Sequence, residues 1–177
     1  MEGSNMPSTT FLNLSKEKKE KIDQSLLKEF SNYSVSEAQV ARIVKTAGIA
    51  RGAFYKYFDD LQDAYKYLYQ QAIAEIHQNI AESRQMLTAE EYRDQIKAFV
   101  NAINGSPYRE LMRLHFQINE NIVSTSQVKA PQPKSGREWG VMVLSHEAIK
   151  ESLQNPEEEE QIIQRCYQAL QALTKEG

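Results

Sequence analysis

Apolar residues recur every three or four positions along most of this chain, which is the spacing of an amphipathic α-helix. The first such stretch covers residues 16–30, where Ile22, Leu26 and Phe30 share one face. Further stretches predict helices that begin near residues 36, 51, 61, 88, 106, 138 and 156. The runs of alternating β-branched residues that indicate strands do not occur. The pattern therefore predicts an all-α protein.

One stretch has the spacing of a helix–turn–helix. The helix predicted over residues 36–47 stops at Gly48, because the residue after a helix often needs a positive φ that glycine adopts without strain. A short helix over residues 51–57 follows, and Phe54 and Phe58 face the same core. An apolar residue just past the glycine, with another five positions later, is typical of this motif.

Four side chains of the short helix do not fit into that core. Arg51, Tyr55, Lys56 and Tyr57 are cationic or aromatic, and a helix of this length cannot bury them all. Such side chains suit the base edges and phosphates of a DNA groove. Packing is the alternative role for the two tyrosines, and plain solvation is the alternative for the two cations.

Charge is distributed unevenly along the chain. The net charge of −3 argues weakly against a nucleic-acid binder. However, residues 15–58 carry nine Lys or Arg against five Asp or Glu, whereas residues 59–177 carry twelve against eighteen. A basic module next to an acidic body can meet phosphate while the body is kept away from it.

Composition restricts the class of protein further. A hydrophobic content of 41% with 25% charged residues is ordinary for a soluble globular protein. No apolar run approaches the roughly 20 residues of a membrane span, and no signal-peptide pattern begins the chain. The single cysteine, Cys166, fits a reducing compartment. We therefore expect a cytoplasmic protein that does not contact a membrane.

Sites of catalysis or metal binding are not expected. His77, His115 and His146 are scattered, with no carboxylate or cysteine at ligand spacing. No phosphate-binding loop, dinucleotide glycines or catalytic triad order occurs either. The chain is therefore predicted to be no enzyme and to carry no metal or cofactor.

The helix–turn–helix resembles the TetR family of bacterial transcriptional regulators over about residues 22–65. The family pattern is a β-branched start to the second helix, Ile, Ala-Gly-Val/Ile, a small residue, Gly, an apolar residue, Tyr, any residue and Tyr-Phe. In this chain it reads Val40, Ile43, Ala47-Gly48-Ile49, Gly52, Phe54, Tyr55 and Tyr57-Phe58.

The resemblance implies a domain organisation and a function. A three-helix DNA-binding domain would cover residues 15–60, and a ligand-binding and dimerisation domain would cover residues 61–177. The residues before them, 1–14, are expected from the sequence itself to be a disordered tail. The protein would be a homodimeric repressor that binds a palindromic operator in double-stranded DNA and is released by a small-molecule effector. The last two helices of each subunit would form a four-helix dimer interface.

Seven positions match DNA-contacting positions of the family. They are Arg51 and Ala53 at bases, Tyr55 at bases or the sugar-phosphate, Lys56 and Tyr57 at phosphates, Gln39 at the backbone, and Gly52 for close approach.

Three positions depart from the family pattern. Ala50 replaces the Ser or Thr that caps the short helix, and Val44 replaces a small residue. Leu61 replaces a lysine that contacts phosphate, so binding should be weaker and less sensitive to salt, by about 0.9 in the logarithmic salt slope per lost contact. Leu61 and the acidic body also favour an alternative, a coactivator of this fold that binds a protein partner instead of an operator.

Two further residue sets are candidates for binding. The aromatic residues that an effector would contact are Tyr65, Tyr69, Phe99, His115, Phe116 and Trp139. Plain core packing is the alternative for each of them. The apolar stripes of the last two helices predict pairing across a two-fold axis, because one subunit does not cover them fully. They contain Trp139, Met142, Val143, His146, Ile149, Ile162, Ile163, Cys166, Leu170 and Leu173.

Overall fold

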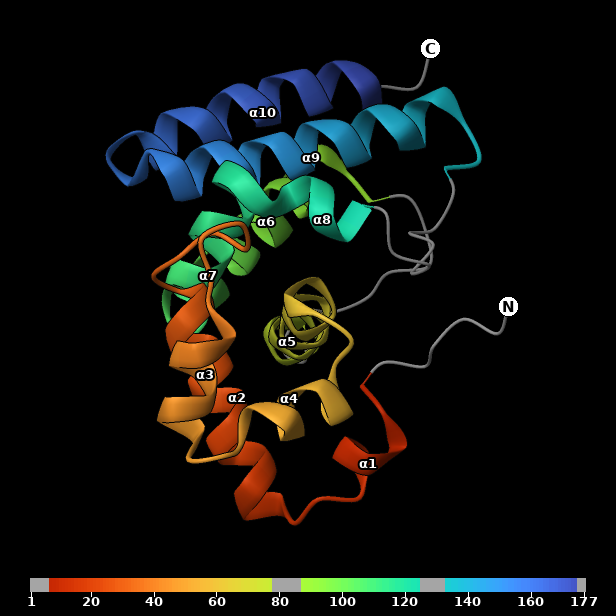
Figure 1. Ribbon diagram of the computed structural model, residues 1–177. Helices are drawn as coiled ribbons and strands as arrows, with labels where there is room; N and C mark the ends of the chain where they lie inside the picture. The colour runs from red at the N-terminus through yellow and green to blue at the C-terminus, as the bar shows by residue number, and fades with distance from the viewer. Residues whose placement is uncertain (1–6, 78–86, 125–132, 175–177) are drawn as a thin grey trace. The chain divides into compact units, whose positions relative to one another are not determined.

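The computed structural model describes residues 7–77, 87–124 and 133–174, and all regular structure in these ranges is helical (Figure 1). The all-α prediction is therefore confirmed. The chain forms two compact units, Met1–Glu75 with Glu110–Ser126 (unit 1) and Ile76–Arg109 with Gln127–Gly177 (unit 2). None of the helices in the described ranges has the length and apolar character needed to cross a membrane.

Unit 1 contains the predicted DNA-binding helices and the segments that pack on them. Its helices are α1 (Thr9–Leu12), α2 (Lys16–Phe30), α3 (Val40–Ala47), α4 (Arg51–Tyr57), most of α5 (Leu61–His77) and α7 (Arg109–Leu114), a π-helix (His115–Asn119) and α8 (Glu120–Ser124). Their largest fully buried side chains include Ile22, Leu26, Phe30, Ile43, Phe54, Phe58 and Tyr65. Residues 78–86, which follow α5 in the chain, lie outside the described residues.

The boundary between the units differs from the domain boundary expected at residue 60. The ring of Tyr65 on α5 packs on Phe30 of α2, with centroids 5.2 Å apart. The backbone N–H of Val35 donates to the side-chain oxygen of Asn119 at 3.2 Å, which attaches the π-helix to the turn before α3. These contacts link segments far apart in sequence, so local spacing did not predict them.

The expected disorder of residues 1–14 is wrong for the part that the structure describes. Ser8 caps α1 by accepting a hydrogen bond from the backbone N–H of Phe11. The Phe11 ring is 1% exposed, against Tyr57, Phe58 and Tyr67. A single buried ring orders this segment, whereas a periodic pattern needs several apolar residues to be recognised. Residues 1–6 lie outside the described residues.

Helix α3 begins later than the predicted start near residue 36. Glu29 of α2, which is 5% exposed, accepts a hydrogen bond from the backbone N–H of Gln39 at 2.7 Å and forms an ion pair with Arg42 at 2.6 Å. The residues before Gln39 form a turn in which the Ser34 hydroxyl donates to Glu37. The predicted stop at Gly48 is confirmed, since Gly48 has φ +67°.

Unit 2 is built from three longer helices, α6 (Ala89–Asn104), α9 (Gly136–Gln154) and α10 (Glu159–Thr174), with a short 3-10 helix (Pro156–Glu158) before α10. Thr88 and Glu91 form a capping box at the start of α6, near the predicted helix start at residue 88. Helices α9 and α10 lie side by side (Figure 1) and pack on α6. The core of the unit contains Ala89, Ile96, Val141, Ala148, Ile162, Ile163, Cys166 and Leu170.

Four residues of the expected dimer interface belong to this core. Ile162, Ile163, Cys166 and Leu170 are each at most 6% exposed within one chain. They pack against α6 and α9 of the same chain, and their contact with a second copy stays a prediction. The sequence predicted the apolar stripe of α10, but it did not predict that α6 and α9 pack against it.

Candidate nucleic-acid interface

Helix α4 is anchored by one face and exposes the other. Phe54 and Phe58 are fully buried, and the Phe58 backbone N–H donates to the Phe54 carbonyl at 2.9 Å. Arg51 and Lys56 are exposed, and the Tyr55 side chain is 48% exposed. The side chains that were expected to contact DNA are therefore on the surface, and those that were expected to anchor the helix are inside.

Arg51 and Tyr55 lie one helical turn apart and contact each other. The Arg51 guanidinium donates to the Tyr55 hydroxyl at 3.4 Å and lies 5.9 Å from the centre of the ring. This contact uses one of the five N–H donors of the guanidinium, so others remain for an external acceptor. An arginine with free donors next to an exposed tyrosine can reach base edges and phosphates together.

The other predicted contact residues surround this pair. Gln39 is exposed at the N-cap of α3, and Ala53 is half-buried on α4. Gly52 is exposed, and a Cβ built on it would meet no protein atom within 4 Å. Tyr57 is half-buried because its ring packs edge-on against Phe11, with centroids 5.7 Å apart.

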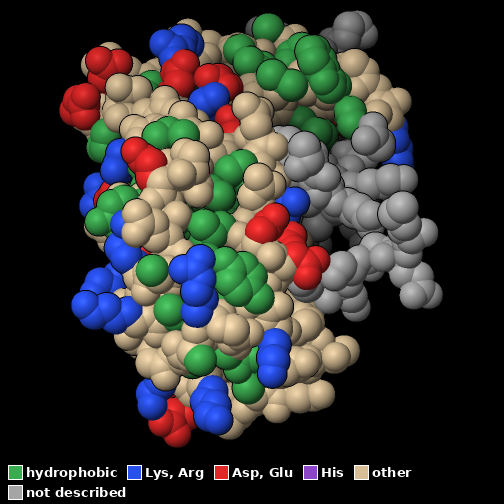
Figure 2. Space-filling view, in the orientation of Figure 1, with side chains coloured by type: hydrophobic (Ala, Val, Ile, Leu, Met, Phe, Trp, Pro, Cys, Tyr) green, Lys and Arg blue, Asp and Glu red, His purple; other side chains and the backbone are tan. Residues whose placement is uncertain are grey.

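The surface around α3 and α4 is predominantly cationic. Figure 2 shows Lys and Arg side chains over these helices, with few acidic ones between them. Lys45 in the last turn of α3 is exposed and adds to this surface. Lys45 was absent from the sequence-based set, although the helical period already places it opposite the buried Ile43 and Ala47 face.

A cavity of about 380 Å³ lies beside Tyr55 within unit 1. Its lining residues are Val35, Ser36, Val40, Tyr55, Asp60, Leu61, Gln62 and Ile122. Leu61 occupies this apolar lining at the position where the family has a lysine. Acidic residues stand on both sides of Leu61 in the chain. Burial, and then the charges of Asp60 and Asp59, raise the pKa of the Asp63 carboxyl.

Four of the six aromatic candidates for effector binding come together in unit 1. The Tyr65 hydroxyl and His115 Nδ1 are 3.0 Å apart, and the His115 ring lies 4.2 Å from Tyr69 and 5.2 Å from Phe116. Burial raises the pKa of Tyr69 to about 12. His115 begins the π-helix, a distortion that is frequent at functional sites.

The other two aromatic candidates belong to unit 2. The Phe99 ring packs on His77 at 5.0 Å, and Trp139 is 58% exposed on α9. The aromatic cluster of unit 1 therefore consists of Tyr65, Tyr69, His115 and Phe116.

Helices α9 and α10 present two apolar surfaces. The exposed row on α9 consists of Trp139, Met142 and Val143, of which the last two are 42% and 45% exposed. His146 is exposed too, whereas Ile149 and Leu173 are half-buried. Figure 2 shows apolar side chains gathered where α10 ends and α9 begins, at the side of the C-terminus.

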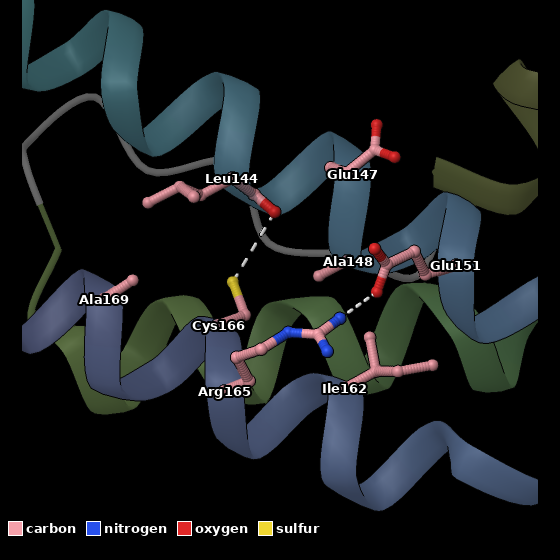
Figure 3. A pocket seen from close by; sticks show the side chains of 8 residues that line it. All are labelled: Leu144, Glu147, Ala148, Glu151, Ile162, Arg165, Cys166 and Ala169. Carbon is pink, nitrogen blue, oxygen red and sulfur yellow. Dashed lines mark hydrogen bonds and ion pairs between the residues drawn. The ribbon is translucent and has the colours of Figure 1, made fainter.

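The second surface is a groove of about 250 Å³ between the two helices (Figure 3). Its lining residues are Leu144, Glu147, Ala148, Glu151, Ile162, Arg165, Cys166 and Ala169. Arg165 pairs with Glu151 across it, and the Cys166 thiol donates to the Leu144 carbonyl at 3.5 Å. Burial raises the pKa of that thiol, which keeps it protonated at neutral pH.

Solved structures with a similar fold are transcriptional regulators. A TetR family regulator from Chloroflexus aurantiacus J-10-FL is 19% identical, with 95% of this chain and 96% of that chain covered and a TM-score of 0.53. A TetR family regulator from Shewanella sp. PV-4 is 18% identical, with 88% and 95% covered and a TM-score of 0.56. The regulator FadR from Bacillus subtilis, solved in complex with stearoyl-CoA, is 16% identical, with 89% and 98% covered and a TM-score of 0.51.

At these identities the similarity establishes the fold. The chain has the all-helical architecture of the TetR family of transcriptional regulators. No protein-family model matches the sequence, and no curated protein matches it.

Proposed function

We propose that this protein is a TetR-type transcriptional regulator, a homodimeric repressor that acts in the cytoplasm and binds a palindromic operator. The observation that carries the proposal is the outward face of α4, where Arg51, Tyr55 and Lys56 are exposed above the buried anchors Phe54 and Phe58. The cationic surface over α3 and α4 supports it, as does the fold shared with known regulators.

In this proposal two copies of α4 occupy successive major grooves, at a separation of about 34–36 Å. A base contact by Arg51 supplies specificity, and Lys56 and Tyr57 fix the register through phosphates. An effector that binds near the aromatic cluster of Tyr65, Tyr69, His115 and Phe116 would release DNA if it favours a state in which the two α4 helices do not fit these grooves.

Selection of bound sites from random duplex DNA, followed by anisotropy titration of the selected site, tests the proposal. We expect wild-type protein to select a palindrome. Arg51→Ala or Tyr55→Ala should weaken binding by roughly 5- to 100-fold, the range for loss of a good base contact. Lys56→Ala should weaken binding to all sequences and lower the salt slope by about 0.9 per phosphate lost.

Lys134→Ala is the matched control, because Lys134 is an exposed cation outside unit 1. It should bind the selected duplex as wild type does. Unchanged affinity in all three α4 variants would refute the assigned face, and selection of no duplex at 100 mM salt would refute operator binding.

The effector is tested separately by ligand-induced release. Stearoyl-CoA is one probe, because the fold is shared with a FadR that was solved with it. A ligand that uses the cluster should lose its effect on DNA binding in Tyr69→Ala, whereas Phe99→Ala in unit 2 should respond as wild type does.

A second candidate function is that of a coactivator that keeps this fold but binds a protein. The cavity beside Tyr55 favours it, since Leu61 makes its lining apolar where a phosphate-binding lysine would be and Asp60 gives it an acidic edge. Leu61→Lys should strengthen duplex binding if the repressor proposal holds. A protein captured from lysate by wild type and lost in Leu61→Lys, together with no selected duplex, would favour the coactivator.

A further inference from the structure

We propose that Ser8 and Phe11, in the short N-terminal helix α1, are positioning residues that hold the recognition helix α4 in its DNA-binding orientation. The inference rests on the proposed function for its consequence, but its geometry is independent of DNA. Neither residue has a side chain that is expected to contact the duplex.

Helix α4 needs support from outside itself. It has seven residues, and helices of this length are unstable in isolation because nucleation is unfavourable. Its N-cap residue, Ala50, forms no side-chain cap, and the first turn contains no acidic residue. Helix ends also leave carbonyl groups without partners inside the helix, and these must be bonded by other groups.

Ser8 bonds to the last carbonyls of α4. Its hydroxyl donates to the carbonyl of Lys56 at 2.6 Å, and its backbone N–H donates to the carbonyl of Tyr57 at 3.1 Å. The same hydroxyl oxygen accepts the backbone N–H of Phe11 at 3.3 Å, which caps α1. One serine therefore joins the beginning of α1 to the end of α4.

Phe11 fixes the side chains at the same end of α4. Its ring lies 5.1 Å from Phe58 and 5.7 Å from Tyr57, centroid to centroid. Tyr67 of α5 covers another side of the ring at 5.1 Å. Since Phe11 is almost fully buried, Tyr57 is held against a fixed neighbour and its half-exposed ring has a restricted range.

The far end of α1 is attached as well. Lys19 of α2 donates from Nζ to the carbonyl of Leu12 at 2.6 Å. Helix α1 is thus bound to α2 at one end and to α4 at the other, so it acts as a brace within unit 1.

Helix α1 holds the two residues of α4 that are expected to bind phosphate. Lys56 and Tyr57 have their main chain held by Ser8, and Tyr57 has its ring held by Phe11. Groups that are already ordered lose less conformational entropy when they bind, which raises affinity without adding a contact. Loosening α1 should therefore weaken DNA binding although no contact to DNA is removed.

The test combines amide hydrogen exchange of the free protein with DNA titration. We expect Ser8→Ala to increase exchange in residues 54–58 by about 5-fold, which corresponds to loss of one ordinary hydrogen bond, and to weaken duplex binding by a similar factor. Phe11→Leu, which keeps an apolar side chain, should act in the same direction. Exchange in residues 40–47 should stay as in wild type.

Two further variants separate positioning from general stability. Thr10→Ala removes an exposed hydroxyl from the same helix and should change neither exchange nor affinity. Ser8→Thr keeps the hydroxyl and should restore both. Unchanged exchange in residues 54–58 in Ser8→Ala and Phe11→Leu would overturn the proposal, as would faster exchange with an affinity equal to that of wild type.

Amide hydrogen exchange also distinguishes a failure of this inference from a failure of the proposed function. If wild type selects no duplex, operator binding fails, and exchange in residues 54–58 alone decides whether α1 holds α4.

Discussion

Packing within the described residues does not explain why position 52 of α4 is a glycine. Only Gly48, of the residues that the structure describes, has a positive φ, so Gly52 is not required by the backbone. A Cβ at Gly52 would meet no protein atom within 4 Å. Glycine inside a helix is less stable than alanine by roughly 0.5–1 kcal/mol. Close approach of α4 to DNA, where a side chain would be in the way, fits these facts.

Gly52→Ala should therefore separate stability from binding. We expect the free energy of unfolding to rise by about 0.5 kcal/mol, because the helix gains propensity without a clash. Affinity for the selected duplex should fall, because the new methyl group lies between α4 and the groove. Urea unfolding and anisotropy measure the two effects. Gly136→Ala on α9 is the matched control, also without a neighbour within 4 Å, and should leave affinity unchanged.

Asp23 on α2 is a second residue whose environment has a measurable consequence. Burial raises the pKa of its carboxyl, and a hydrogen bond with Tyr67 opposes part of that shift. Its Oδ1 is buried without a hydrogen-bond partner among the described residues. The fold therefore disfavours the charged form of this carboxylate.

Asp23→Asn should raise the melting temperature at pH 7 by roughly 2–4 °C if the gain is near 1 kcal/mol. The carboxyl has a higher pKa in the folded state than in the unfolded state, so the folded wild type binds a proton more readily and gains stability as pH falls through that raised pKa. The advantage of the variant should consequently shrink on acidification. Thermal melts between pH 7 and pH 4 test this, and a constant difference across that range would contradict it.

At the scale of elements, α4 is a helix supported at one end. Ser8 supplies partners for its last carbonyls, whereas Ala50 at the N-cap supplies none for its first N–H groups. The backbone of Ala50, with φ −69° and ψ 146°, already has the extended conformation of a capping residue. The departure from the family pattern at Ala50 thus concerns only the side chain.

Ala50→Ser should raise the free energy of unfolding by about 1 kcal/mol, because serine can accept the N–H groups of the first turn. It should also reduce the effect of Ser8→Ala on hydrogen exchange, since both act on the same short helix. Ala41→Ser, at an exposed position inside α3, is the control and should slightly lower stability. An equal gain in both variants would exclude capping as the cause.

The start of α3 and the π-helix show where local pattern was insufficient. The helix was predicted to begin near residue 36, yet Glu29 accepts the backbone N–H of Gln39 and α3 begins only after that residue. Asn119 in the π-helix accepts the backbone N–H of Val35, which anchors the same turn from another direction. Both partners come from distant parts of the sequence, so no window of neighbouring residues contains the signal.

At the scale of the whole molecule, the proposed dimer has a surface available for it. Trp139, Met142 and Val143 form an exposed apolar row on α9, whereas Ile163 and Leu170 of α10 are buried within their own chain. Contiguous exposed apolar residues of this size often mark interaction sites. A second copy is the partner that the proposed function requires.

The double variant Trp139→Ser with Val143→Ser should weaken self-association. Wild type is expected to sediment at twice the 20.3 kDa chain mass at micromolar concentration, and the variant at the mass of one chain. Gln164→Ser with Gln168→Ser, at exposed polar positions of α10, is the control and should remain dimeric. If wild type sediments at the mass of one chain, the proposed dimer is wrong. If only the control dissociates, the interface lies on α10 and not on α9.

Local spacing along the chain was sufficient for the helical class, the stop at Gly48 and the division of α4 into buried and exposed residues, because period and glycine geometry act over a few neighbouring positions. Tertiary contacts settled which apolar stripes are covered, since the partners of Leu170 on α10 and of Phe11 on α1 are far away in sequence. They also order α1 against the end of α4, through bonds from Ser8 to residues 56 and 57. A hydrogen bond between positions 48 residues apart leaves no trace in the local pattern of either segment.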